Sequence, residues 1–262
     1  MLSRIRSALS SLISGGGGLV FIAASSLPMS FDRLAPHYRW MEWLLAGGKL
    51  QCCRTAFLPA VPRPRHALLL GEGNGRFLIA LLRAHPGIRF TCVDASARML
   101  QGTQARLKQE GIGAEGGRFI HANVLAWIPP AAEFDLIVTN FFLDCFPPEA
   151  LETVLSRVTG AAAPSARWLV ADFREPPAGW RRWRARGILR LMYWFFRRAT
   201  ALPAKQLTPP DVILQRSGFK LVGRRLHDWG LLHSDLWERE KLPLAAPHET
   251  ATWTGASVTL PS

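Results

Sequence analysis

The chain has 262 residues, of which 48% are hydrophobic, so it is long and apolar enough for one α/β domain with additional segments or for two small domains. This composition excludes a disordered or collagen-like chain. The formal net charge is +13, but the acid-free stretch between Glu175 and Asp211 contributes +8 of it, so the basic character is local and does not favour nucleic acid as a partner.

The N-terminal stretch 1–28 contains two arginines, four consecutive glycines, a short apolar run and no acid. The apolar run, 19–24, is far too short to span a bilayer, and a signal peptide is the alternative. The pattern of a folded domain begins at Phe31. We therefore expect residues 1–28 to form a flexible extension, with Met29 as a candidate natural start, which N-terminal sequencing or intact mass would decide.

Two helices, 37–46 and 50–58, are predicted before the prolines at 59–64 break the chain. Apolar runs then alternate with helical patterns. The predicted strands are 66–70, 88–93, 118–122, 134–139 and 166–171, and the predicted helices among them are 76–84, 95–110 and 148–158. Because each strand is an apolar run, this alternation indicates a doubly wound, mostly parallel sheet.

The C-terminal third departs from this alternation. A basic, aromatic helix is predicted over 180–198 and a second helix over 210–217. Two strands, 219–226 and 231–238, lie so close in sequence that they predict a hairpin at the end of the sheet. Residues 241–262 are expected to form a flexible tail.

The four cysteines, Cys52, Cys53, Cys92 and Cys145, form no Cys-x-x-Cys pair. They also lack the spacing of zinc ligands. The sequence therefore predicts reduced thiols in a cytoplasmic protein, and no metal.

A glycine loop follows the first apolar strand directly and precedes a helix. Its residues are Gly71, Glu72, Gly73, Asn74 and Gly75. Glycines let the backbone approach a ligand closely, and a helix start offers free N–H groups. Arg76 occupies the sixth position, so the pattern is not the G-x-G-x-x-G of dinucleotide sites, and no G-K-[ST] follows. A carboxylate inside the loop would repel a pyrophosphate and would suit an amine or a sulfonium.

Asp94 ends the second strand, 21 residues after Gly73. A carboxylate at this place can accept hydrogen bonds from the ribose hydroxyls of a nucleoside cofactor. The alternative is a helix N-cap, since a helix is predicted to start near Ala95. Loop, acid and strand context together favour a nucleoside-containing cofactor.

With these motifs, the chain resembles the class I S-adenosylmethionine (SAM)-dependent methyltransferase family. The resemblance covers about 31–238 and is carried by ALLLGEGNGR, FTCVDASARML, FIHANVLAWIPP, FDLIVTNFFLDCFPP and RWLVADFREP. The segment FDRLAPHYRW is also similar to the opening of quinone-type and related small-molecule methyltransferases. The resemblance implies a seven-stranded, mostly parallel, Rossmann-like sheet with a terminal antiparallel hairpin, in a domain over 29–240 with a lid inserted at about 177–208.

The resemblance also implies site residues. The cofactor-binding set is Gly71, Glu72, Gly73, Asn74, Gly75, Asp94, Ala95, Asn123, Val124 and Asn140. Asn123 stands where the family contacts adenine and often has Asp. Asn140 and Phe141 fall where the methionine part of SAM and the acceptor meet. Tyr38 matches a tyrosine that closes over the site.

Methyl transfer from a sulfonium is an in-line displacement, so the enzyme must mainly align the reactants and exclude water. A base helps when the acceptor is a phenol or an activated carbon. The candidate bases are His37, His121, Asp144 and His233. Asp144 ranks first because it follows the fourth strand, although it could instead cap the helix near Pro148. Polar surface positions are the expectation for His227 and His233 on the terminal hairpin.

Two features bear on the acceptor. The fourth strand ends in Asn-Phe-Phe-Leu, 140–143, rather than the Asn-Pro-Pro-aromatic of enzymes that methylate adenine or glutamine amines. This favours a small, apolar or aromatic acceptor. The segment Trp180–Arg198 mixes arginines with aromatic residues, as helices at membrane interfaces do. It predicts either a lid that docks on anionic membrane and admits a lipid- or quinone-like acceptor, or a lid whose aromatic residues pack on the domain.

Two other functions stay open at this point. A non-catalytic SAM-binding protein would share the cofactor loop. A nicotinamide oxidoreductase is disfavoured by Glu72 and Arg76. The acceptor atom and the oligomeric state are not encoded in any motif of the chain.

Overall fold

The computed structural model describes residues 19–21, 48–200, 204 and 206–240 of the chain. The helix predicted over 37–46, with His37 and Tyr38, lies outside these residues. So do Met29 and the tail predicted from 241.

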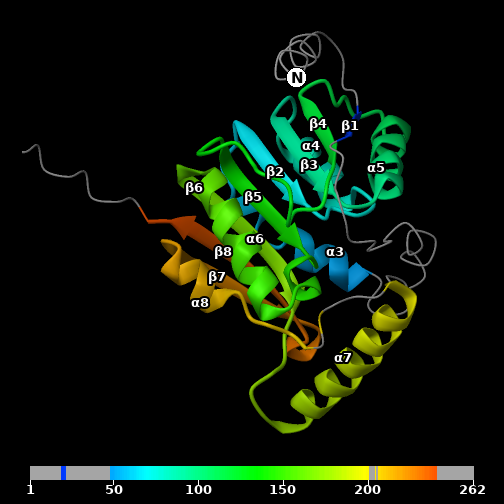
Figure 1. The fold of residues 1–262 in the computed structure, drawn as a ribbon, viewed down its shortest axis with the longest axis vertical. Helices are drawn as coiled ribbons and strands as arrows, with labels where there is room; N and C mark the ends of the chain where they lie inside the picture. Colours follow the sequence, from blue (N-terminus) through cyan, green and yellow to red (C-terminus); the bar gives the residue numbers. More distant parts are fainter. Residues whose placement is uncertain (1–18, 22–47, 201–203, 205, 241–262) are drawn as a thin grey trace, which may run out of the picture.

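The described residues form an eight-stranded sheet in the order β1-β4-β3-β2-β5-β6-β8-β7 (Figure 1). Its strands are β1 (Leu19–Phe21), β2 (His66–Leu70), β3 (Arg89–Asp94), β4 (Gly117–His121), β5 (Phe134–Asn140), β6 (Ala162–Phe173), β7 (Phe219–His227) and β8 (Leu232–Arg239). The neighbours from β1 to β6 pair in parallel, and β8 runs antiparallel to both β6 and β7. The predicted seven-stranded sheet with its terminal hairpin is thus confirmed.

The eighth strand, β1, is short and lies at the edge of the sheet. It comes from the N-terminal stretch that we expected to be a flexible extension, and its three residues pair with 119–121 of β4. The apolar Leu-Val-Phe run is well suited to a strand position, which accounts for this pairing.

Helices cover both faces of the sheet. They are α3 (Gly48–Thr55), α4 (Arg76–Ala84), α5 (Ala97–Gln109), α6 (Pro148–Ala161), α7 (Gly179–Thr200) and α8 (Asp211–Arg216), with short helical turns η2 (Leu58–Ala60), η3 (Leu143–Cys145) and η4 (Asp228–Gly230). Each helix predicted within the described residues is present, with ends that shift by no more than a few residues.

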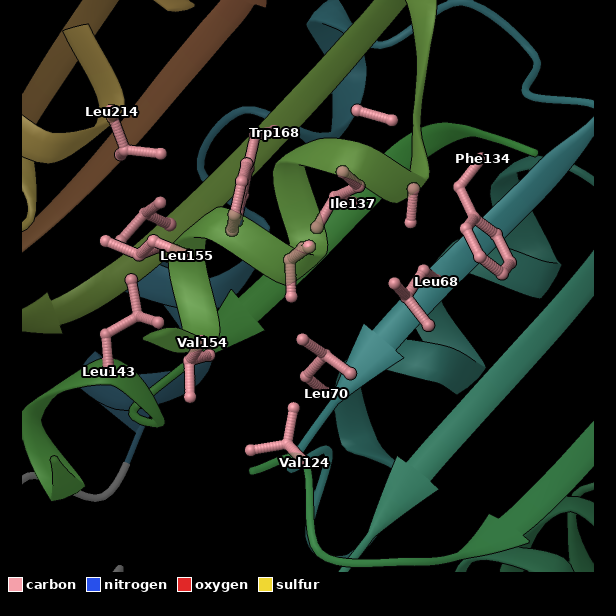
Figure 2. Packing of buried hydrophobic residues seen from close by; sticks show 14 of the residues in the cluster. Leu68, Leu70, Val124, Phe134, Ile137, Leu143, Val154, Leu155, Trp168 and Leu214 are labelled. Carbon is pink, nitrogen blue, oxygen red and sulfur yellow. The ribbon is translucent and has the colours of Figure 1, made fainter. Parts of the chain in front are cut away.

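The core consists of two layers, because successive strand residues point to opposite faces of the sheet. One buried cluster joins Leu68 and Leu70 of β2 to Val154 and Leu155 of α6 and to Trp168 of β6 (Figure 2). Alternate residues of the central strands pack on the opposite face, against α4 and α5. The strands are apolar on both sides for this reason, as their sequence predicted.

A third apolar cluster joins α7 to the rest of the molecule. Its α7 members are Ala185, Leu189, Met192 and Tyr193, which recur at helical spacing and are all buried. They pack with Phe173 at the end of β6 and with residues of α3 and β8. The segment predicted to be a lid is therefore a helix with one face fixed beside the carboxyl end of β6 (Figure 1).

Candidate functional site

The glycine loop after β2 has a backbone that other residues rarely adopt. Gly71, Gly73 and Gly75 have φ angles of 62°, 69° and 78°. A Cβ atom at Gly75 would lie 2.8 Å from the methyl carbon of Thr103 on α5, and one at Gly71 would overlap the ring of Phe142. Glycine is thus required both by the conformation and by close neighbours.

Glu72 has a role that the sequence did not predict. Gly75 is the N-cap of α4 and has no side chain to accept the first helical N–H groups. The Glu72 carboxylate supplies this capping acceptor, because its Oε1 accepts from the backbone N of Phe77 (2.8 Å) and of Leu78 (3.0 Å). Burial raises the pKa of Glu72 to about 7, against the opposite effects of these hydrogen bonds and of nearby Arg54. Glu72 therefore fixes the loop to the helix start.

Asp94 lies at the carboxyl end of β3, partly exposed, as the sequence predicted. Its Oδ1 accepts from the backbone N of Ser96 at 2.8 Å. The alternative that Asp94 caps the next helix is wrong, because Ser96 is the N-cap of α5 and accepts from the backbone N of Met99 at 3.2 Å. His121, opposite Asp94 in the sheet, lies with Nε2 3.0 Å from the carbonyl oxygen of Ala95.

Asn123 and Val124 follow β4 near Asp94. Asn123 Oδ1 accepts from the backbone N of Leu125 at 3.0 Å, which forms a local turn. The Val124 side chain is 6% exposed and packs in the core beside Leu70 (Figure 2). Any contact that Val124 makes with a ligand would therefore involve its backbone.

Asn140 ends β5 next to the glycine loop's strand. It is 5% exposed, and within the described part of the chain neither Oδ1 nor Nδ2 of its amide has a hydrogen-bond partner. A buried amide without partners is costly, so this side chain fits a polar group of a ligand that completes the site. The cofactor predicted from the sequence supplies such groups in its amino-acid part.

Phe141, the next residue, is strained. Its φ of 53° is rare for a bulky side chain, and its backbone N donates to the carbonyl of Ala171 at 2.7 Å. The guanidinium of Arg54 from α3 lies 5.1 Å from the centre of its ring, and the ring centres of Phe141 and Phe173 are 5.3 Å apart. Arg54 is 6% exposed. No motif in the sequence pointed to it, because its neighbours come from distant segments.

Asp144 and Asp172 form a buried acid pair. Asp144 lies in η3 and is 7% exposed, and its backbone N donates to Asp172 Oδ2 at 3.2 Å. Burial raises the pKa of Asp144 to about 6. Burial and the neighbouring charge of Asp144 hold the pKa of Asp172 well above its ordinary value. The alternative that Asp144 caps α6 is wrong, because Pro147 is the N-cap and no side chain caps this helix.

Asp172 was missed in the sequence analysis, which ended the strand at Ala171. The available signal was an acid directly after an apolar strand, the pattern that identified Asp94. Tyr193 connects α7 to the pair, because its hydroxyl donates to the carbonyl of Asp144 at 3.3 Å.

The two histidines of the terminal hairpin differ. His227 Nε2 lies 3.1 Å from Ser234 Oγ. His233 is 4% exposed and lies opposite Asp172 in the sheet, with Nδ1 3.1 Å from Asp235 Oδ1. The expectation of a surface position is therefore wrong for His233, because the antiparallel strand β8 is inserted between β6 and β7 and buries it.

The described segments 48–200 and 206–240 show neither a metal-binding cluster nor a membrane-spanning helix. In these segments no three His, Cys, Asp or Glu side chains are grouped so as to hold a metal ion. No helix within them is long and apolar enough to cross a bilayer.

Comparison with known proteins gives matches at the level of sequence. Residues 67–165 match the family model described as a methyltransferase domain. A demethylmenaquinone methyltransferase of Chlamydia felis is 32% identical over 31% of this chain and 35% of its own length. A trans-aconitate 2-methyltransferase of Paracidovorax citrulli is 31% identical over 43% of this chain and 41% of its own length. The chain thus matches less than half the length of these two curated relatives.

Comparison of structures extends the likeness to most of the chain. A mitomycin 7-O-methyltransferase matches at a TM-score of 0.59 and 18% identity, covering 80% of this chain and 61% of the other. The 1,6-didemethyltoxoflavin-N1-methyltransferase of Burkholderia thailandensis, solved with S-adenosylhomocysteine, matches at 0.53 and 20% identity, covering 83% and 92%. At these identities the likeness establishes the fold. That fold is the Rossmann-like sheet of these methyltransferases, with the same kind of strand order, and the sequence match to a methyltransferase domain covers residues 67–165.

Proposed function

We propose that this protein is a SAM-dependent methyltransferase that acts on a small acceptor. The observation that carries the proposal is the buried amide of Asn140 beside the glycine loop, which has no hydrogen-bond partner among the residues that the structure describes. Asn140 and the loop backbone would hold the methionine part of SAM, Asp94 the ribose, and the turn at Asn123 the adenine. When bound, SAM supplies an electrophilic methyl group.

Asp144 is the base in this proposal. The Asp144 carboxylate would take the acceptor's proton as the acceptor receives the methyl group that SAM would supply. With a pKa of about 6, Asp144 is ionised at neutral pH and is a stronger base than an exposed aspartate. Asp172 is a positioning residue, because its carboxylate fixes the backbone of Asp144. His121 and Tyr38 are alternative groups for this step.

A small, apolar or aromatic acceptor fits the surroundings of Asp144. Phe141 and Phe173 lie close to each other at the ends of β5 and β6, and Phe142 packs on Phe146. Several structural relatives carry aromatic small molecules in their names, one of them solved with SAM and a naphthoic acid. A phenol or a quinone-like ring is the acceptor class that we propose.

The test is turnover. The purified protein is incubated with SAM and a panel of phenols, quinols and carboxylic acids, and formation of S-adenosylhomocysteine is measured. SAM binding by calorimetry without turnover of any acceptor would support the alternative, a non-catalytic SAM-binding protein. Tight binding of NAD without binding of SAM would refute the proposal and support an oxidoreductase.

We also propose that the protein works at the cytoplasmic surface of an anionic membrane, which α7 contacts. Four large apolar side chains of this helix are exposed, namely Trp180, Trp183, Leu191 and Trp194. Anionic lipid attracts basic residues near its surface by about 1 kcal/mol each. Co-sedimentation with anionic vesicles that weakens with added salt would support this contact, and its absence would remove it.

A further inference from the structure

An exposed tryptophan on the terminal hairpin lies beside the outer face of α7. Trp229, in the turn η4 between β7 and β8, is 58% exposed. Its ring centre lies 5.7 Å from that of Trp180 at the start of α7. The guanidinium of Arg181 lies over both rings, 6.0 Å from the centre of Trp180 and 5.6 Å from that of Trp229. The two tryptophans are 49 positions apart in sequence, so only the fold brings them together.

The turn holds Trp229 in an unfavourable conformation. Asp228, Trp229 and Gly230 have φ angles of 45°, 61° and 87°, all in the left-handed region. For a bulky residue such as tryptophan this conformation costs free energy, and such strain is typically found at functional positions. Because the indole is exposed, packing in the core of the protein does not offset this strain.

Ion pairs fix the turn to α7. The Asp228 carboxylate, whose side chain is 2% exposed, accepts from Arg184 Nη2 of α7 at 2.9 Å and from Lys49 Nζ of α3 at 2.6 Å. Arg184 Nη1 also donates to the carbonyl of Asp228 at 3.4 Å. The position of Trp229 relative to the helix is therefore defined by the charged hydrogen bonds that α7 and α3 make to the neighbouring Asp228.

The surface around Trp229 is apolar and positively charged. Of nine exposed large hydrophobic side chains among the described residues, five lie on it, and four of these belong to α7. The arginines paired with Glu175 are Arg182 and Arg186. Four further arginines of α7 are exposed and pair with no acid of the described segments: Arg181, Arg190, Arg197 and Arg198. Exposed indoles surrounded by arginines complement the headgroup region of an anionic bilayer, where tryptophan is favoured.

We infer that Trp229 and the outer face of α7 form one docking surface for anionic lipid, in which Trp229 and Trp180 insert together. This inference rests on the proposed membrane contact of α7 and adds the hairpin turn as a second point of attachment. The terminal hairpin also carries His233, which lies opposite Asp172 in the sheet. Attachment at two points would therefore set how the acid pair at the ends of β5 and β6 is oriented toward the lipid.

The experiment compares the full-length wild type with two variants in co-sedimentation with vesicles of phosphatidylcholine, with and without phosphatidylserine. Trp229→Asn removes the indole, and asparagine tolerates the left-handed backbone. Val222→Asn is the matched control, because Val222 is 53% exposed on the same hairpin, in β7, away from the turn. We expect W229N to lose about tenfold in binding to the anionic vesicles, and V222N to match the wild type.

The outcomes separate the two proposals. If the wild type binds no vesicle, the membrane contact of α7 fails and this inference fails with it. If the wild type binds and W229N binds equally well, the contact of α7 stands and the role of Trp229 is refuted. Brominated lipid gives a second readout, since it should quench more tryptophan fluorescence in the wild type than in W229N. Equal quenching would also overturn the inference.

Discussion

Replacing Asp144 by Asn should make the protein inactive and more stable at the same time. The substitution keeps the size of the side chain and leaves the contacts of the Asp144 backbone, which donates to Asp172 and accepts from Tyr193, in place. It removes the charge and the base. General-base catalysis contributes about 10²- to 10⁴-fold, so kcat/KM should fall by that factor while SAM affinity is unchanged.

The stability change follows from the pKa. Burial raises the pKa of Asp144 from its ordinary value of 3.8 to about 6, so keeping the carboxylate ionised in the folded protein costs about 3 kcal/mol. A raised pKa means that this cost is absent below pH 3.8, develops as the pH rises, and is complete above about pH 6. The neutral amide avoids it, so D144N should unfold about 6–12 °C higher than the wild type at neutral pH and should lose this advantage in acid.

The assay combines thermal unfolding from pH 4 to 8 with methyl transfer to a responsive phenol, and the wild-type rate should rise with an inflection near pH 6. Glu152→Gln is the matched control, because it makes the same acid-to-amide change at an exposed site on α6. If D144N keeps wild-type kcat/KM, Asp144 is not the base. If D144N is less stable than the wild type at neutral pH, the account of its burial is wrong.

Three other predictions concern the cofactor loop and its neighbours. Gly75→Ala should destabilise the protein by about 1–3 kcal/mol in urea unfolding, because residue 75 has a φ of 78° and the added Cβ would contact Thr103. Gly102→Ala is the control and should not destabilise the protein, since its Cβ would have nothing near it. Equal losses of stability in the two variants would contradict this prediction. Asn140→Leu should abolish measurable SAM binding in calorimetry without lowering the stability of the ligand-free protein, since it removes an amide that has no partner within the described part of the chain. A stability loss would show that the amide is satisfied. Asp94→Asn should weaken SAM binding about 10- to 100-fold by loss of charged hydrogen bonds, and unchanged affinity would mean that Asp94 serves only the turn at Ser96.

The sequence alone determined the frame of the site. β2 and α4 begin and end where the apolar runs and the glycines predicted, because strand and helix periodicity are local properties of the chain. The carboxyl ends of parallel strands meet at one edge of the sheet. The positions of the glycine loop and of Asp94 along that edge therefore followed from local patterns.

Contacts between distant segments were decided only by the tertiary structure. Asp144 and Asp172 become a pair because β5 and β6 are neighbours. His233 is buried because β8 runs antiparallel beside β6, and Trp229 meets Trp180 because the hairpin turn ends next to α7.

These contacts share a physical origin. Each depends on strand order and register between segments that are far apart in the chain, and these are set by packing of the whole sheet. A hydrophobic pattern shows which residues of a helix or strand are buried, but not which distant residues pack against them. The sequence therefore located the glycine loop and Asp94, whereas the acid pair and the tryptophan surface required the fold.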